Sequence, residues 1–212
     1  MTPVKFARLL FLPTLLVLLS GCPFSPGDSH KPPVIVSDYL DPISPENVLK
    51  NLITSYQQQR LDEYAKLFDQ DEFFFEFSQL DRDTDPSLPL GLSYTEDQAT
   101  TRNMFDDETL ERIVLRFNRD AAVDATDLDQ LPGGPTGVQK VTAQSVHLEV
   151  HTQNENGEPL EYLVDGDGAD FFFRSYDVGR SDGKRVFRII RWRDKPVGGA
   201  FTVGQLKHGT AS

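Results

Sequence analysis

The residues best suited to chemistry are two histidines and a glutamate on one predicted strand. His147, Glu149 and His151 fall on the same face of the alternating segment 138–153, a spacing that could suit a metal ion. Residues at i and i+4 of an extended strand lie about 13–14 Å apart, so both histidines cannot bind one ion directly. We therefore place these side chains on a solvated face and predict no metal site.

A second candidate is the acidic run Asp165-Gly-Asp-Gly-Ala-Asp170, which is similar to a calcium-binding loop. It departs from the EF-hand order, which requires an acid or Asn at 169, a Gly at 170 and a later bidentate Glu. A turn or a strand bulge is the better interpretation. The sequence also has no Ser–His–Asp pattern, no phosphate-binding loop and no cysteine nucleophile. We predict no catalytic residue and no cofactor.

The single cysteine belongs to a targeting signal. Lys5 and Arg8 precede the apolar run 9–19, which is followed by Leu19-Ser20-Gly21-Cys22. This order resembles a bacterial lipoprotein signal, and the run is too short to span a bilayer as a mature helix. The resemblance implies that residues 1–21 are removed and that Cys22 carries lipid. The alternative is an ordinary signal peptide cut nearby.

The same resemblance gives an expected location. A lipid on Cys22 would hold the protein on a membrane of the bacterial cell envelope. Pro23, rather than Asp, follows the cysteine. By resemblance to known sorting rules, this implies the periplasmic face of the outer membrane in a cell with two membranes.

Charge excludes one class of partner. The 212 residues contain 21 Lys and Arg against 33 Asp and Glu, a formal net charge of −12. Such a chain is repelled by nucleic acid and by anionic lipid headgroups, so we expect no nucleic-acid partner. With one cysteine, no disulfide can form within the chain. The fold must be stabilised by packing, for which 15 Phe and 6 Tyr are available.

The chain divides into a spacer, one domain and a tail. Residues 22–43 are rich in Pro, Ser, Asp and Gly and predict a flexible spacer. The domain is expected over 44–195, beginning with a helix that Ser44 caps and that Pro45 starts. Apolar residues then recur at helical spacing through Tyr56 and again through Phe68. The segment 196–212 is predicted to be a loose tail.

Strands are expected to follow these helices. The segment 72–77 predicts a strand with Phe73, Phe75 and Phe77 on one face. A short helix with a capping box from Thr95 to Gln98 is predicted next. Further strands are expected over the ranges 110–117, 138–153, 160–164, 169–176 and 186–193. The ranges 160–164 and 169–176 are either two strands or one bent strand with a glycine bulge.

This order resembles the nuclear transport factor 2-like family, which includes SnoaL-like proteins. The residues that carry the resemblance are SPENVLKNLITSYQQQRLDEYAKLFDQDEFFFEF at 44–77 and VFRIIRWRD at 186–194. The resemblance implies an α+β fold, in which a curved antiparallel sheet wraps the N-terminal helices into a cystatin-like cone. The cone leaves an apolar pocket that serves catalysis or is filled as plain core.

Enzymes of this fold place an acid or base inside the cone, where burial shifts its pKa. Here the candidate lining is mostly aromatic: Tyr56, Tyr64, Phe73, Phe75, Phe77 and Trp192. Asp38, Asp71, Asp97 and Arg191 could approach the pocket mouth, but each is better explained as a cap, a turn residue or a solvated strand residue. The sequence thus favours a binding or assembly module over its alternative, an envelope enzyme performing acid–base chemistry on a small apolar substrate.

The second face of the sheet needs a cover. Phe171, Phe172 and Phe173 must alternate between the two faces of their strand. Exposed aromatics at that density usually mark a partner. We expect a homodimer or an envelope protein partner on this outer face, which carries either Phe172 or the pair Phe171 and Phe173, depending on the register of the strand. A covering segment of the chain itself is the alternative.

Overall fold

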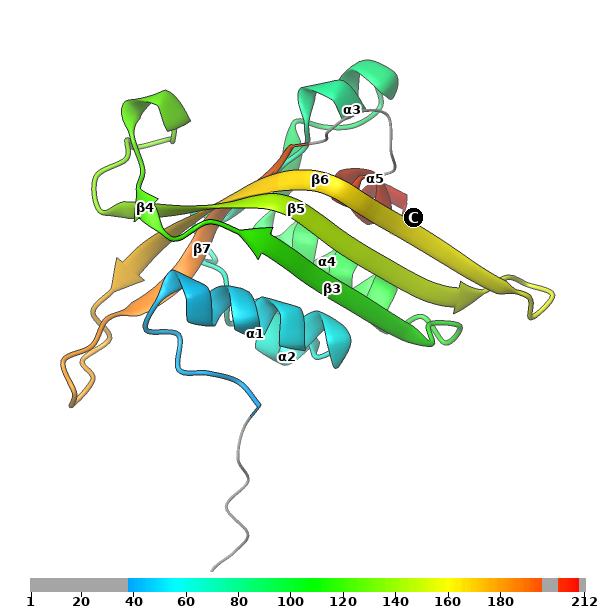
Figure 1. Cartoon of the computed structure of the whole chain (residues 1–212), viewed down its shortest axis with the longest axis horizontal. Helices are drawn as coiled ribbons and strands as arrows, with labels where there is room; N and C mark the ends of the chain where they lie inside the picture. Colours follow the sequence, from blue (N-terminus) through cyan, green and yellow to red (C-terminus); the bar gives the residue numbers. More distant parts are fainter. Residues whose placement is uncertain (1–37, 196–201, 210–212) are drawn as a thin grey trace, which may run out of the picture. The chain divides into compact units, whose positions relative to one another are not determined.

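The fold is built on one strongly bent sheet with helices packed on its inner face (Figure 1). The computed structural model describes residues 38–195 and 202–209, which lie within one compact unit, Ser37–Ser212. The elements follow in this order: α1 Pro45–Gln57, α2 Leu61–Ala65, β1 Phe74–Glu76, α3 Gln79–Thr84, β2 Gly91–Ser93, α4 Tyr94–Phe105, β3 Arg112–Arg119, β4 Val123–Asp124, the 3-10 turn η1 Asp127–Asp129, β5 Val138–Gln153, β6 Pro159–Tyr176, β7 Val186–Lys195 and α5 Val203–Gly209.

The sheet has the strand order β2-β1-β7-β6-β5-β3, and β4 pairs with the edge of β5. All neighbouring pairs are antiparallel except β1 and β7, which run parallel. The fold is therefore the predicted α+β curved sheet, with one parallel pair that the sequence analysis did not anticipate. Among the described residues, no helix is long and apolar enough to cross a membrane.

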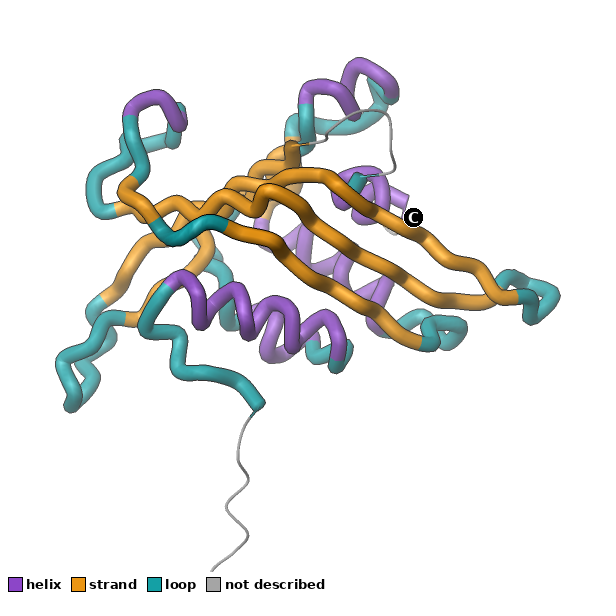
Figure 2. The backbone as a smooth tube through the Cα atoms, in the orientation of Figure 1, coloured by secondary structure: helices purple, strands orange, loops and turns teal. Residues whose placement is uncertain are grey.

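Bulges give the long strands their bend (Figure 2). The segment 159–176 is one strand, which settles the choice between two strands and one bent strand. His147 pairs with Asp165 and Val146 pairs with Asp167, so Gly166 is an extra residue in β6. Its φ of 86° lies in the left-handed region, where glycine carries no Cβ penalty.

Helix α1 begins where the sequence predicts. The Ser44 hydroxyl accepts a hydrogen bond from the Asn47 amide at 3.3 Å, and Pro45 occupies the first turn. Val48, Leu49 and Leu52 recur on one face and are fully buried. The helix therefore packs its apolar stripe against the inner face of the sheet.

Helix α4 begins earlier than predicted. The capping box lies at Ser93 and Glu96, where the Ser93 amide donates to Glu96 Oε2 at 2.8 Å. The expected box at Thr95 and Gln98 is wrong, because the overlapping Ser-Tyr-Thr-Glu segment carries the same pattern two residues upstream. Ser93 also ends β2, paired with Phe74, and this pairing fixes the start of the helix.

Both flanking segments contribute more to the domain than expected. The backbone of Leu40, in the predicted spacer, forms two hydrogen bonds of 2.7 Å with the Asn51 side chain. In the predicted tail, residues 203–209 form α5, and its Val203, Leu206 and Lys207 are buried. The loose-tail prediction is therefore wrong for this part, because α5 covers apolar residues of the core. The signal segment, Cys22 and the rest of the spacer and tail lie outside the described residues.

The chain itself covers the outer face of the sheet around Phe172. Of the two registers left open, the structure has the one in which Phe172 points outward, but Phe172 is 0% exposed and packs with Leu131, Val138 and Ile190. Leu131 belongs to an acidic excursion between β3 and β5, residues 120–137. In that excursion Asp129 accepts from Lys140 Nζ at 2.6 Å and from the Thr126 amide at 2.8 Å. The expectation of an exposed aromatic residue on this face is thus wrong for Phe172. Association through this face stays a prediction.

Candidate functional site

An aromatic cluster fills the inner side of the sheet. All six side chains proposed as pocket lining are buried in the main core: Tyr56, Tyr64, Phe73, Phe75, Phe77 and Trp192. Phe75 and Trp192 face each other across the parallel β1–β7 pair, with ring centroids 5.4 Å apart. Tyr56 and Tyr64 meet edge to face at 5.6 Å. Phe73 lies beside Phe68 and is not part of the group around the ion pair described next.

A buried ion pair occupies the space between these rings. Lys207 Nζ lies 2.6 Å from Asp97 Oδ1, and the two side chains are 3% and 0% exposed. The ammonium also donates to the Tyr64 hydroxyl and to Thr101 Oγ1, both at 3.2 Å. The Tyr64 hydroxyl in turn donates to Asp97 Oδ2 at 2.6 Å. The set is a closed network in which each carboxylate oxygen has a donor.

Three aromatic rings surround the ammonium of Lys207. Its Nζ lies 5.6 Å from the ring centroid of Tyr64 and 5.4 Å from those of Phe75 and Trp192. These distances are within the range of cation–π attraction. Among the described residues the buried Trp192 Nε1 has no hydrogen-bond partner. These three rings, with Asp97, Thr101 and the neighbouring Tyr56, form a buried aromatic cage around Lys207, and Asp97 is its acidic group.

Four helices bring the polar groups of this site together. Asp97 and Thr101 are one turn apart on α4, so both face the cone. Tyr56 comes from α1, Tyr64 from α2 and Lys207 from α5. No segment of the sequence contains more than two of these residues, so their meeting is a consequence of the tertiary fold.

Burial and the ion pair shift the pKa values of the cage residues. Burial alone would lower the pKa of Lys207, but the adjacent Asp97 carboxylate more than compensates and raises it. Burial, followed by the charge of Asp97, holds the pKa of Tyr64 well above its usual range. Burial also raises the pKa of Tyr56. At neutral pH the cage therefore holds a charged lysine and two neutral tyrosines.

The two charged members of this site were not predicted from the sequence. Asp97 was explained as a cap or turn residue, whereas it lies one turn before Thr101 on the buried face of α4. Lys207 was placed in the loose tail. The apolar spacing of Val203 and Leu206 was the available signal for a short amphipathic helix, and Lys207 follows directly on its buried side.

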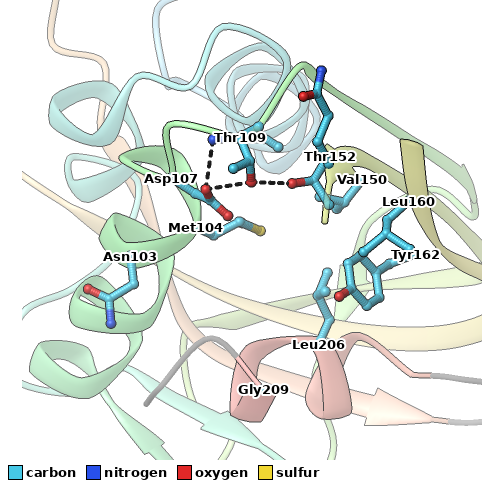
Figure 3. Close-up of a pocket in the computed structure, with 12 residues that line it drawn as sticks. Asn103, Met104, Asp107, Thr109, Val150, Thr152, Leu160, Tyr162, Leu206 and Gly209 are labelled. Atoms are coloured by element: carbon cyan, nitrogen blue, oxygen red, sulfur yellow. Dashed lines mark hydrogen bonds between the residues drawn. The ribbon is translucent and has the colours of Figure 1, made fainter. Parts of the chain in front are cut away.

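A pocket opens at the mouth of the cone (Figure 3). Its volume is about 360 Å³. The polar side has a hydrogen-bonded group in which Thr109 Oγ1 lies 2.5 Å from Thr152 Oγ1 and 2.7 Å from Asp107 Oδ1. The apolar side chains of the lining are Met104, Leu110, Val150, Leu160, Tyr162 and Leu206. The arrangement can hold a small apolar body with a few polar groups at its edge.

The histidine cluster on the outer face is an ion-pair network. Glu149 lies between the two histidines, 2.7 Å from His147 Nε2 and 3.1 Å from His151 Nε2. These contacts lower the pKa of Glu149 to about 2. Ligand atoms of Glu149, His151 and Glu161 lie within 4.8 Å of one another. However, Arg112 Nη2 is 3.2 Å from His151 Nε2, so a guanidinium already supplies positive charge there, and we assign no metal.

No family model matches the sequence, and no curated protein matches it. Solved structures with a similar backbone include the Kfla4162 protein of Kribbella flavida, with 13% identity, 79% of this chain and 95% of that chain covered, and a TM-score of 0.48. A candidate aromatic ring hydroxylase of Novosphingobium aromaticivorans has 8% identity, coverages of 79% and 96%, and a TM-score of 0.47.

A structure from the nuclear transport factor 2-like family is also among the matches. It is a candidate dehydratase of Streptomyces avermitilis, with 12% identity, coverages of 72% of this chain and 92% of that chain, and a TM-score of 0.44. At these identities the likeness concerns the fold alone. It gives no role to any residue of this chain.

Proposed function

We propose that this is a lipid-anchored cell-envelope protein whose domain is a binding module, taking a small ligand with an apolar body in the pocket at the cone mouth. The observation that carries the proposal is the occupied cone. Lys207 and its 2.6 Å contact with Asp97 fill the interior, where an enzyme of this fold would hold its substrate. The room for a ligand is at the mouth.

The mouth pocket has the composition of a small-molecule site. Small-molecule sites of about 300–1,000 Å³ are typically lined by apolar side chains with a few placed polar groups. At about 360 Å³, this pocket suits a ligand at the small end of that range. Leu160 and Tyr162 on β6 remain partly open to solvent, which gives a ligand apolar surface to cover.

Two substitutions on one strand test the pocket. Leu160 and Leu163 lie on opposite faces of β6 and are 40% and 44% exposed, so Leu160→Gln and Leu163→Gln remove similar apolar area. We expect Leu160→Gln to weaken binding of an apolar dye such as Nile red about fivefold or more, because the pocket loses an apolar wall. Leu163→Gln should bind as the unaltered protein does.

The measurement is a fluorescence titration of the three proteins at equal concentration. Equal weakening by both substitutions would mean that the dye reports general surface apolarity. No weakening by either would place the dye outside the mouth pocket. Either result contradicts the proposed site.

The anchor is tested at Cys22. The support for it is the run of Lys5 and Arg8, the apolar segment 9–19 and the Leu19-Ser20-Gly21-Cys22 box. Cys22→Ser should abolish incorporation of labelled fatty acid and move the protein from the membrane fraction to the soluble fraction. A control of Ser25→Ala should leave both properties unchanged. A Cys22→Ser protein that still takes up the label would contradict the anchor.

A second candidate function is acid–base catalysis on a small apolar substrate inside the cone. It is favoured by one observation, the Asp97 carboxylate and the Tyr64 hydroxyl 2.6 Å apart in a buried aromatic site. In this interpretation Asp97 would accept a proton and Tyr64 would donate one. Substrate could reach Asp97 only if α5 left the cone. The catalytic alternative therefore predicts an open cone in the unaltered protein, and the binding module predicts a closed one.

A further inference from the structure

The interior of the cone holds the charged amine of Lys207 between a carboxylate, hydroxyl oxygens and aromatic rings, which are the groups that recognise amines. We infer that this cage is a binding site for an organic ammonium group, and that Lys207 is the resident occupant that such a ligand replaces. The inference goes beyond the proposed function, because the cage is separate from the mouth pocket and depends on its own contacts.

The contacts match the chemistry of a primary ammonium group. Such a group has three N–H donors and no acceptor. Oxygen acceptors of Asp97, Tyr64 and Thr101 lie 2.6, 3.2 and 3.2 Å from Lys207 Nζ, so each N–H donor has an oxygen within reach. The three rings within 5.6 Å add attraction for a cation over a neutral group of the same shape.

A cage without any ammonium group is energetically unfavourable, whereas a cage in which another ammonium group replaces that of Lys207 keeps its favourable contacts. Withdrawal of Lys207 alone would leave the Asp97 carboxylate buried without a counter-charge. A ligand ammonium in the same place restores the ion pair and the hydrogen bonds. The exchange keeps the ion pair, so its costs are the local packing of Lys207 and the desolvation and ordering of the incoming amine.

Helix α5 is also attached to the domain at its start, by contacts outside the cage. The start of the helix is fixed separately, since the Gly204 amide donates to Asp194 Oδ2 at 2.9 Å and the Thr202 hydroxyl donates to Asp81 Oδ2 at 3.0 Å. Leu206 and Gly209 flank Lys207 in the sequence and line the mouth pocket. A ligand that enters the mouth thus lies beside the turn that carries Lys207.

The cage can be tested with amines that replace the missing atoms. Lys207→Ala removes three carbons and the ammonium group, which n-propylammonium supplies, while 1-propanol supplies the same shape without the charge. Trp192, the single tryptophan of the chain, lies in the cage and reports occupancy by its fluorescence. We expect Lys207→Ala to bind n-propylammonium about tenfold more tightly than 1-propanol.

Two control variants test whether Asp97 causes the preference of Lys207→Ala for n-propylammonium over 1-propanol. Adding Asp97→Asn to Lys207→Ala should remove it, because the carboxylate is the charged partner. Lys66→Ala, at a lysine whose side chain is 64% exposed, should create no response to either compound. Equal affinity of Lys207→Ala for the amine and the alcohol would overturn the ammonium site.

The unaltered protein tests whether Lys207 can be replaced. n-Butylammonium should speed amide hydrogen exchange in residues 203–209 and leave exchange in β5 and β6 unchanged, whereas 1-butanol should have no effect on either. Unchanged exchange in residues 203–209 at amine concentrations that saturate Lys207→Ala would make Lys207 a permanent part of the core and overturn the inference. If Lys207→Ala does not fold, the exchange experiment on the unaltered protein decides the question by itself. In that case, unchanged hydrogen exchange in residues 203–209 in the presence of n-butylammonium contradicts the ammonium site.

Discussion

Replacing Asp97 by asparagine is expected to destabilise the domain by about 3–5 kcal/mol, because it leaves the buried ammonium of Lys207 without a counter-charge. Asparagine keeps the volume of the side chain and an oxygen that can accept from Tyr64. The loss therefore reports the charge rather than a cavity. The measurement is the free energy of unfolding from denaturant melting.

A double variant separates two contributions to the free energy of unfolding: the net contribution of the ion pair and the penalty for leaving one buried charge unpaired. Asp97→Asn combined with Lys207→Met removes both charges and keeps the side-chain lengths to within one atom. Because desolvation offsets much of the attraction in a buried ion pair, the double variant should recover most of the lost stability. Additive losses in the double variant would mean that Asp97 and Lys207 do not interact in solution.

The pH dependence of the free energy of unfolding is an independent test of the Asp97–Lys207 pair. The pKa of Lys207 is raised in the folded state, so its stabilising contribution is present below the unfolded value and is lost as pH rises through the folded value. In Asp97→Asn the unpaired, buried lysine should have a lowered pKa, so its penalty disappears as pH rises. The stability gap between the two proteins should therefore narrow between about pH 8 and about pH 11. A constant gap would contradict the pairing.

Trp192→Ala should cost about 3–5 kcal/mol, the range for a large aromatic residue removed from a packed core. The indole is almost fully buried, with ring centroids 4.8 Å from Phe171 and 5.4 Å from Phe75. It also forms one wall of the cage around Lys207. The substitution thus leaves a cavity and weakens the ammonium site at the same time.

An exposed aromatic provides the control for this prediction. Tyr162→Ala, at a ring that is partly open to solvent, should change the free energy of unfolding by less than about 1 kcal/mol. Denaturant melting of both variants gives the comparison. A loss below about 1 kcal/mol for Trp192→Ala would place the indole outside a well-packed core.

The parts of the fold that were predictable are those with local signals. Ser44 and Pro45 mark the start of α1, and the alternation of Phe73, Phe75 and Phe77 gives the buried face around β1. The long strand β5 likewise follows from the alternation over 138–153. In each case neighbouring residues contain the whole pattern.

The candidate site was not predictable because its charged pair is non-local. Asp97 and Lys207 are 110 residues apart in sequence and meet only through the docking of a seven-residue helix. Each charged residue taken alone fits a solvated surface. The cover over Phe172 has the same origin, since Leu131 lies in a segment that composition marks as acidic loop.

Solvent access to Trp192 tests most directly whether the cone is closed, as a binding module with its pocket at the mouth requires. The chain has one tryptophan, and it lies in the cage, so acrylamide quenching of its fluorescence reports the cone interior without labels. The account predicts a quenching constant far below that of free N-acetyltryptophanamide, and a clear rise in a chain that ends at Thr202 and lacks α5. Quenching of the unaltered protein close to that of the free compound would show an open cone and contradict the account.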